Sequence, residues 1–510
     1  MAHIELPQWQ IDKVKSLAKD IAEDIQTFID KKSSVSVERT ILRLYGVDGA
    51  LEDGTPIPNK IVELLDNIEN GVSRPFAAAM LKTRQNPQTT AEKIIKGEIE
   101  FGGLQGFHPD LIKNTEILLS RAAVKRLDMA KVLKEIKKGA WKLPPQPWRY
   151  IIVASGNIYE DRIQAKSAAQ AGADMIAVIR STAQSLLDYV PYGATTEGYG
   201  GTYATQENFK IMREALDEVS QKEGRYIRLV NYSSGLCMAE IAACAALEDL
   251  DVLLNDSMYG ILFRDINMQR TFIDQYFSRL ICARAGILIN TGEDNYLTTS
   301  DAMEKAYTVT ASDLINEATA KRAGLTDDLL GLGHAFEIDP KIENAFLYEL
   351  AHAQLARELF PNAPLKYMPP TKYKSTDIFF SHCLDTMFNL ASVTTKQGIH
   401  LTGLLTEAIH TPLMQDRYQS LSSVNYVFNI ARNLGDEIEF KKGGIIETRA
   451  KEVLDEADKC LEEVKEIGLM ESIARGRFAD IKRPIEGGKG LDGVFEKGKN
   501  YSNPIMEALK

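Results

Sequence analysis

Tyr150-Ile151-Ile152-Val153-Ala154 opens the part of the chain that decides the fold. It is followed by Ser155-Gly156-Asn157, by a helix-like stretch to Gly172 and by Met175-Ile176-Ala177-Val178-Ile179. Two short apolar runs stand on either side of one stretch with helical composition. Such an alternation is typical of parallel β-strands that are joined by a crossover helix. We therefore predict a βαβ unit over these residues.

The same pattern continues along the chain. Further apolar runs, each followed by polar or glycine residues and a helix-like stretch, begin at Ile227, Val252, Ile287, Gly333 and Leu365, with a less regular one near Ile399. Together with the first two runs they make about eight strands, the number that a closed barrel requires. An open, doubly wound sheet would give the same local pattern. We predict an α/β fold, a TIM-type (β/α)8 barrel, over residues 148–440.

Helical regions are expected on both sides of the barrel. In residues 1–147, Val14, Leu17, Ile21, Ile25 and Phe28 recur at steps of three and four and form one apolar helix face. This mainly helical accessory region ends at the proline-rich stretch 144–147. Residues 441–510 are expected to form a helix and an irregular tail. The glycines of 487–490 could be a phosphate loop, but they do not join a strand to a helix, which favours a tail on the surface.

Composition excludes several classes of function. The net charge is −11, with 44% hydrophobic and 26% charged residues, which is globular composition without a basic field for nucleic acid. No signal peptide or apolar run of membrane-spanning length occurs, so we expect a cytoplasmic protein that does not bind membranes. The five cysteines form no Cys-x-x-Cys pair, and neither a disulfide nor a zinc site is predicted.

Polar residues follow nearly every predicted strand. In β/α barrels the loops after the carboxyl ends of the strands build the active site. The residues in question are Ser155, Asn157, Arg180, Ser185, Asn231, Ser234, Asn255, Asp256, Tyr259, Arg264, Asp294, Asn295, His334, Glu337 and Lys366. For any one of them alone, helix capping or a salt bridge is the better explanation. Together they predict a polar mouth above an apolar barrel.

A glycine- and hydroxyl-rich loop, residues 192–202, follows the second strand. Its backbone amides could approach a phosphate or a carboxylate closely, with Arg180 supplying positive charge. A plain long loop explains the composition equally well.

Two Glu-x-x-His spacings, Glu349 with His352 and Glu407 with His410, could place a carboxylate and an imidazole on one helix face, as di-metal sites require. Such sites need further glutamates on facing helices of a bundle, so we predict no metal site here. No dinucleotide fingerprint, Walker motif or nucleophile elbow occurs either.

At these same strand ends the chain resembles the large (alpha) subunits of the lysine 5,6-aminomutase family. The resemblance is strongest in residues 154–161, 184–201, 234–238, 259–270, 290–298 and 365–371. It covers about 149–440, returns around Val37-Glu38-Arg39 and in the tail, and is weakest over about 81–147.

The resemblance implies a radical enzyme that uses pyridoxal 5'-phosphate and adenosylcobalamin. Such an enzyme moves the terminal amino group of D-lysine or L-β-lysine to the adjacent carbon, and the protein binds, orients and protects the reactive species. A smaller cobalamin-binding partner subunit would supply the cobalt ligand, in a hetero-oligomer of alpha and beta chains. This agrees with the seven histidines of the chain, none of which has an aspartate two positions earlier, as cobalt-ligating Asp-x-His-x-x-Gly motifs do.

The resemblance also implies roles for single residues. Arg180 and Ser185 would bind the cofactor phosphate, Ser234 would lie by the pyridine nitrogen, and Asn295 would lie by the phenolic oxygen. Tyr259 would stack on the ring. Arg264 and Lys366 would bind the substrate carboxylate and Asp294 its stationary ammonium, so that Tyr259, Asp294 and Lys366 are the expected catalytic residues.

Alternatives remain at this point. The lysine that holds the cofactor as a Schiff base is implied to belong to the partner, although Lys366 competes for this role within the chain. A related enzyme acting on another diamino acid such as ornithine is possible, but its large chain usually carries its own cobalamin domain. A metal-dependent oxidase and a non-catalytic binding scaffold are the remaining hypotheses.

Overall fold

The barrel strands are nearly all where the sequence predicts them. The computed structural model describes residues 3–99, 101, 106–179, 184–232, 235–369 and 371–510. Its parallel strands are β2 (Trp148–Ile152), β3 (Met175–Ile179), β4 (Arg228–Asn231), β5 (Val252–Leu254), β6 (Leu288–Asn290), β7 (Leu330–Gly331), β8 (Gly333–His334), β9 (Lys366–Tyr367) and β10 (Ile399–Leu401).

The parallel sheet closes on itself, which decides between the barrel and the open sheet. Its strand order is β7-β6-β5-β4-β3-β2-β10-β9-β8. The first and last members, β7 and β8, are separated only by Leu332, so they are two halves of one interrupted strand. The amide of Lys366 donates to the carbonyl of Leu332 at 2.9 Å, while that of Thr291 donates to Gly331 at 3.1 Å. The predicted eight-stranded barrel is confirmed.

Side chains alternate between the barrel axis and the helices outside, as a pleated strand requires. Tyr150, Ala177, Val230 and Leu288 belong to one buried cluster along the axis, while neighbours such as Ile151 pack outward. The outer helices are α7 (Ile158–Gln170), α8 (Gln206–Glu223), α9 (Met238–Leu247), α10 (Ser257–Arg264), α11 (Met268–Ala285), α12 (Ala302–Arg322), α13 (Ala345–Leu359), α14 (Ile378–Thr394), α15 (Met414–Ile430) and α16 (Leu434–Glu437).

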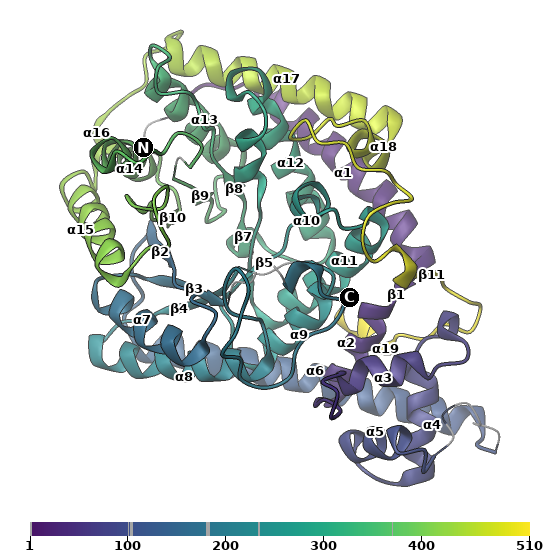
Figure 1. The fold of residues 1–510 in the computed structure, drawn as a ribbon. Helices are drawn as coiled ribbons and strands as arrows, with labels where there is room; N and C mark the ends of the chain where they lie inside the picture. Colours follow the sequence, from purple (N-terminus) through teal and green to yellow (C-terminus); the bar gives the residue numbers. More distant parts are fainter. Residues whose placement is uncertain (1–2, 100, 102–105, 180–183, 233–234, 370) are drawn as a thin grey trace.

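The N-terminal and C-terminal parts of the chain pack together against the barrel helices, with α1 beside α17 and β1 beside β11 (Figure 1). In the N-terminal part lie α1 (Gln8–Lys31), β1 (Lys32–Ser34), α2 (Val35–Tyr45), α3 (Ile57–Glu63), α4 (Ser73–Thr83), α5 (Pro87–Ile95) and α6 (Pro109–Ala140). In the C-terminal part lie α17 (Ile445–Ile467), α18 (Leu469–Ala474), β11 (Val494–Glu496) and α19 (Pro504–Leu509). Strands β1 and β11 pair antiparallel, and α17 packs on α1, α12 and α13.

Helix α6 lies in the region where the family resemblance is weakest, and it packs against the loops that precede β5 and β6 at the amino end of the barrel. Its buried Lys134 donates to the carbonyls of Leu250, Ala285 and Gly286 at 2.9 to 3.0 Å. Burial lowers the pKa of Lys134 to about 8. Throughout the described ranges we find no helix with the length and apolar character needed to span a membrane.

One barrel histidine gives a prediction for pH. His400 of β10 points outward, where its Nε2 lies 2.7 Å from Asn389 Oδ1, and burial lowers its pKa to about 3. Because the unfolded chain binds this proton near pH 6.5 and the folded chain does not, stability falls as pH decreases from 6.5 towards 3. We expect His400→Gln to reduce this loss by about 1 kcal/mol per pH unit in urea unfolding. The exposed His382→Gln is the control, and an unchanged pH dependence in His400→Gln would contradict the prediction.

Candidate active site

A cavity of about 540 Å³ opens at the carboxyl mouth of the barrel. Its walls come from the ends of β2, β4, β9 and β10 and from the loops after β6, β9 and β10. They include Ile152, Tyr232, Asn295, Met368, Thr402, Lys374, Glu407 and His410. A larger cavity of about 630 Å³ lies at the amino end, beside Pro147, Arg149 and Asn425. Because barrel enzymes place their chemistry at the carboxyl mouth, the 540 Å³ cavity is the candidate site.

A fully buried ion pair lies directly behind this cavity. Lys366 Nζ is 2.9 Å from Asp294 Oδ2 and donates to the carbonyl of Thr291 at 2.6 Å, and neither side chain of the pair is exposed. Tyr232 and Asn295 connect the pair to the cavity. The Lys366 ammonium lies 5.7 Å from the centre of the Tyr232 ring, and the Asn295 amide donates to Asp294 at 3.0 Å.

The ion pair sets the charge of Lys366. Burial disfavours its ammonium, but Asp294, together with Tyr232 and Glu293, outweighs burial and raises the pKa of Lys366 above its ordinary value. For Asp294 the balance differs, because burial raises the pKa of its carboxyl although Lys366 opposes the change. Lys366 is therefore protonated and ion-paired, which makes it a good anion partner and a poor nucleophile.

The other acids near Asp294 are arranged differently. Asp256 and Glu293 are buried and both accept from the amide of Asn316. Burial raises the pKa of both carboxyls, and that of Glu293 is raised further by Asp256. Of these three acids, Asp294 is the one that pairs with a lysine.

Tyr259 and Arg264 form a second pair at the mouth, on α10. Arg264 Nη2 donates to the Tyr259 hydroxyl at 3.0 Å, and the guanidinium lies 5.4 Å from the centre of the ring. The Tyr259 side chain packs against Gly292, where an added Cβ would come within 3.0 Å of it. Because residue 292 is a glycine, the Tyr259 ring can lie directly against the loop that carries Asp294 and Asn295.

A third cluster involves the loops after β3 and β4. Ser185, almost fully buried in the turn Gln184–Leu186, accepts through its carbonyl from the amide of Leu236 at 3.2 Å. A Cβ at Gly235 would lie 2.3 Å from that carbonyl, so the two backbones are in close contact. The turn also packs against α10, which carries Tyr259. Arg180 and Ser234, predicted for the same area, lie outside the described residues.

These contacts bring the described site residues together. Ser185 is connected to Tyr259 through α10, Tyr259 to Asp294 through Gly292, and Asp294 to Lys366 by the ion pair. These residues therefore lie on neighbouring loops at one end of the barrel, and their shared role as a polar mouth stays a prediction.

Several strand-end residues have structural roles instead. Asn157 caps α7 by accepting from Tyr159 and Glu160, and Asp256 caps α10 by accepting from Met258. His334 lies 2.9 Å from Gln397 within the protein. Capping explains Asn157 and Asp256, and the contact with Gln397 explains His334.

The two glycine-rich segments also serve packing. In the loop 192–202, Gly198 lies against Gly156, where an added Cβ would meet the carbonyl of Gly198 at 2.7 Å. In the tail, the carbonyls of Ile485 and Gly487 accept from Asn267. The amide of Lys489 also donates to the carbonyl of Asp265 at 2.8 Å, so the backbone of this segment is bound to the start of α11.

The two Glu-x-x-His pairs do not form a metal centre. Glu349 accepts from the amide of Ile338 at 3.1 Å, and the His352 ring stacks on Phe336. Glu407 and His410 lie in a turn segment rather than on a helix. Within the described part of the chain, no group of three or more acidic, histidine or cysteine side chains could hold a metal ion.

The sequence analysis missed Lys374 at the mouth and gave Glu337 no specific role. Lys374 is buried, pairs with Asp385 at 2.8 Å and with Glu407 at 3.2 Å, and lines the cavity. The carboxylate of Glu337, which the sequence did place at a strand end, accepts from the amides of Thr371 and Lys372 and so fastens the loop after β9. The sequence signal that could have indicated Lys374 is its position shortly after Lys366.

The fold and the site define a β/α-barrel enzyme subunit with a charged pocket at the carboxyl mouth. A family model described as the D-lysine 5,6-aminomutase TIM-barrel domain of the alpha subunit matches residues 4–508. The chain belongs to this family, and it is a subunit of an isomerase.

Individual relatives agree with this assignment. The lysine 5,6-aminomutase alpha subunit of Fusobacterium nucleatum is 53% identical over 100% of this chain and 99% of its own length. That of Acetoanaerobium sticklandii is 52% identical over 98% of this chain and 97% of its own length. The D-ornithine 4,5-aminomutase subunit beta of the same organism is 27% identical and covers 71% of this chain and 51% of its own length.

Proposed function

We propose that this chain binds pyridoxal phosphate and the substrate in an adenosylcobalamin-dependent lysine 5,6-aminomutase. The enzyme would move the terminal amino group of D-lysine or L-β-lysine to the adjacent carbon. A smaller partner subunit would carry cobalamin and the lysine that stores pyridoxal phosphate. The observation that carries the proposal is the buried Lys366–Asp294 pair at the mouth, two residues for which the family resemblance implies substrate binding.

The pocket has a size that suits this cofactor, and the polar groups expected to bind it lie in or near its wall. A volume of 540 Å³ lies within the range of about 300–1,000 Å³ that is common for small-molecule sites. Asn295 offers an amide at the cavity wall, and Ser185 and Tyr259, on neighbouring loops outside its lining, would offer a hydroxyl for the phosphate and an aromatic ring. When bound, pyridoxal phosphate supplies a conjugated system that can accept an unpaired electron beside the migrating nitrogen, and the protein orients it.

The charged residues suit a zwitterionic substrate end. Lys366 and Asp294 neutralise each other in this structure, and the polar end of an amino acid would separate them. Its carboxylate would pair with Lys366 and Arg264, and its stationary ammonium with Asp294, so the number of opposite-charge contacts rises. The cations lie at one end of this arrangement and the anion at the other, which favours one orientation of the substrate.

The state of Lys366 supports storage of the cofactor on a partner lysine. A lysine that reacts with an aldehyde must lose its proton, and Asp294 favours the protonated form of Lys366. Similarity favours lysine over ornithine as the substrate, because the lysine enzymes match almost the full chain at about twice the identity.

The test is turnover in the assembled enzyme with each isomer of lysine and with D-ornithine. We expect Arg264→Met to lower kcat/KM for lysine by about 10- to 100-fold, the value of one charge-assisted hydrogen bond to a carboxylate. Arg475→Met, at an exposed arginine that pairs with Glu471, should be neutral. Turnover of ornithine alone, or full activity in Arg264→Met, would contradict the proposal.

A further inference from the structure

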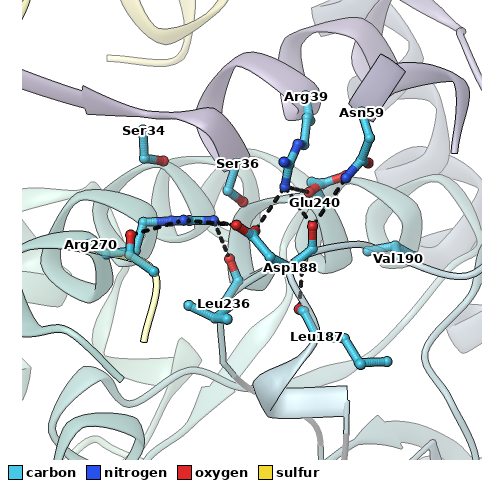
Figure 2. Close-up of polar contacts among 12 residues, drawn as sticks. Ser34, Ser36, Arg39, Asn59, Leu187, Asp188, Val190, Leu236, Glu240 and Arg270 are labelled. Carbon is cyan, nitrogen blue, oxygen red and sulfur yellow. Dashed lines mark hydrogen bonds and ion pairs between the residues drawn. The ribbon is translucent and has the colours of Figure 1, made fainter. Parts of the chain in front are cut away.

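The loop after β3 is held from behind by an ionic network centred on Asp188 (Figure 2). Arg39 of α2 lies 2.8 Å from Asp188 Oδ1 and donates to the Asp188 carbonyl at 2.7 Å. Arg270 of α11 donates to the same Oδ1 at 2.7 Å and to Oδ2 at 3.3 Å. Asp188 follows Ser185 by three residues, and the turn between them is closed by a bond of 3.0 Å from the amide of Leu187 to the carbonyl of Gln184.

Arg270 joins this loop to the next one. It is fully buried, and all its nitrogens have partners: Nε donates to Asp274, and the two terminal nitrogens donate to Asp188, to the carbonyl of Leu236 and to that of Gly490. Leu236 belongs to the loop after β4, whose backbone touches Ser185. One guanidinium therefore fixes the spacing of the two loops that meet at Ser185.

The N-terminal helices complete the network. Asn59 of α3 donates to the Asp188 carbonyl at 3.1 Å. Arg43 of α2 pairs with Glu240 of α9 at 2.9 Å, and Glu240 also lies 3.9 Å from Arg39. Burial opposes ionisation of Asp188, but Arg270 and Arg39 outweigh it and hold the pKa of this carboxyl below its usual value. The network is therefore ionised, and it lies behind the loop rather than in the cavity.

We propose that Asp188, which forms ion pairs with Arg39 and Arg270, is a positioning residue that fixes the place at which Ser185 binds the phosphate of the cofactor. The inference rests on the proposed function, because it takes the phosphate of pyridoxal phosphate to bind at Ser185. Loops are the most mobile parts of a barrel, and a binding group on a loop needs a rigid support. Here the support comes from the N-terminal region and the tail. Substitutions in these two regions therefore change the affinity for the cofactor, although neither region contacts it.

The test compares Asp188→Asn with a matched variant at the other end of the barrel. Asp174 is likewise a buried aspartate that holds two arginines, Arg149 at 2.7 Å and Arg225 at 2.9 Å. The full-length chain, alone and with its partner subunit, is titrated with pyridoxal phosphate and with pyridoxal, and the thermal midpoint of each variant is recorded. We expect Asp188→Asn to bind pyridoxal phosphate about 10- to 100-fold more weakly, as displaced binding groups do, with pyridoxal unchanged.

The controls separate positioning from general destabilisation. Asp174→Asn should lower the thermal midpoint and leave the affinity for pyridoxal phosphate unchanged. Equal affinity in wild type and Asp188→Asn, or an equal loss in both variants, overturns the inference alone. If the wild-type complex bound neither form of the cofactor, the proposed function itself would fail. Should Asp188→Asn not fold, Arg39→Gln, which leaves the Arg270 contacts in place, is expected to give a smaller loss of the same kind.

Discussion

Replacing Asp294 by asparagine in the assembled enzyme is expected to lower kcat/KM for lysine by about 1,000-fold. The substitution removes the anion that balances the buried Lys366 and the partner proposed for the stationary ammonium. Breaking one member of a buried, hydrogen-bonded charge pair costs about 2–5 kcal/mol, and each 1.36 kcal/mol is a factor of ten. Steady-state kinetics with D-lysine and L-β-lysine measure the effect.

A double variant separates catalysis from stability. Asp294→Asn alone should lower the unfolding midpoint, because an unpaired ammonium is left in the interior. Lys366→Met combined with Asp294→Asn should recover much of that midpoint, since removing both charges of a buried pair is often neutral for stability. Activity should stay lost in the double variant. Asp251→Asn, which breaks the buried Arg213 pair outside the site, should affect stability only. Near-normal turnover in Asp294→Asn would refute the role of this residue.

Gly235→Ala is expected to abolish measurable binding of pyridoxal phosphate, a loss of about 100-fold or more. Its backbone has a φ of +155°, and an added Cβ would lie 2.3 Å from the carbonyl oxygen and 2.4 Å from the Cα of Ser185. Main-chain atoms cannot move aside as a flexible side chain can, so the loops after β3 and β4 must separate. Titration with pyridoxal phosphate and the thermal midpoint measure the result.

Gly193→Ala is the control for this experiment. Gly193 lies in the segment that follows the same turn and also has a positive φ, of +81°, but an added Cβ there would have no atom within 4 Å. We expect a cost of about 1 kcal/mol in stability from backbone strain and no change in cofactor affinity. If Gly235→Ala bound the cofactor like the wild type, the contact between the two loops would not matter for binding.

Much of the barrel could be predicted from local sequence. The apolar run 175–179 coincides with β3, because five apolar residues in a row between polar turns leave few alternatives. Closure could not be predicted in the same way. It depends on two short half-strands around Leu332, and the register of such short strands is fixed by their neighbours rather than by their own residues.

The site was predictable only in part. Strand-end positions and the family resemblance together pointed to Tyr259, Arg264, Asp294 and Lys366. The structure pairs Tyr259 with Arg264 and Asp294 with Lys366, and the roles of these residues stay predictions. The sequence could not show that Asp294 and Lys366 pair, or that Asn157 and Asp256 are caps. The network behind Ser185 was missed because its partners are distant in the chain: Arg39 and Asp188 are separated by 149 positions, and Asp188 and Arg270 by 82.

The pairing of β1 with β11 has a consequence for biosynthesis. Residues 32–34 emerge from the ribosome early, yet their strand partners are residues 494–496, and Glu38 accepts from the hydroxyl of Tyr501 at 2.8 Å. The tail carbonyl of Gly490 also supplies one of the bonds that hold Arg270. Strand β1 can therefore complete its pairing, and Arg270 its contact with the tail, only after residues 490–501 have been synthesised.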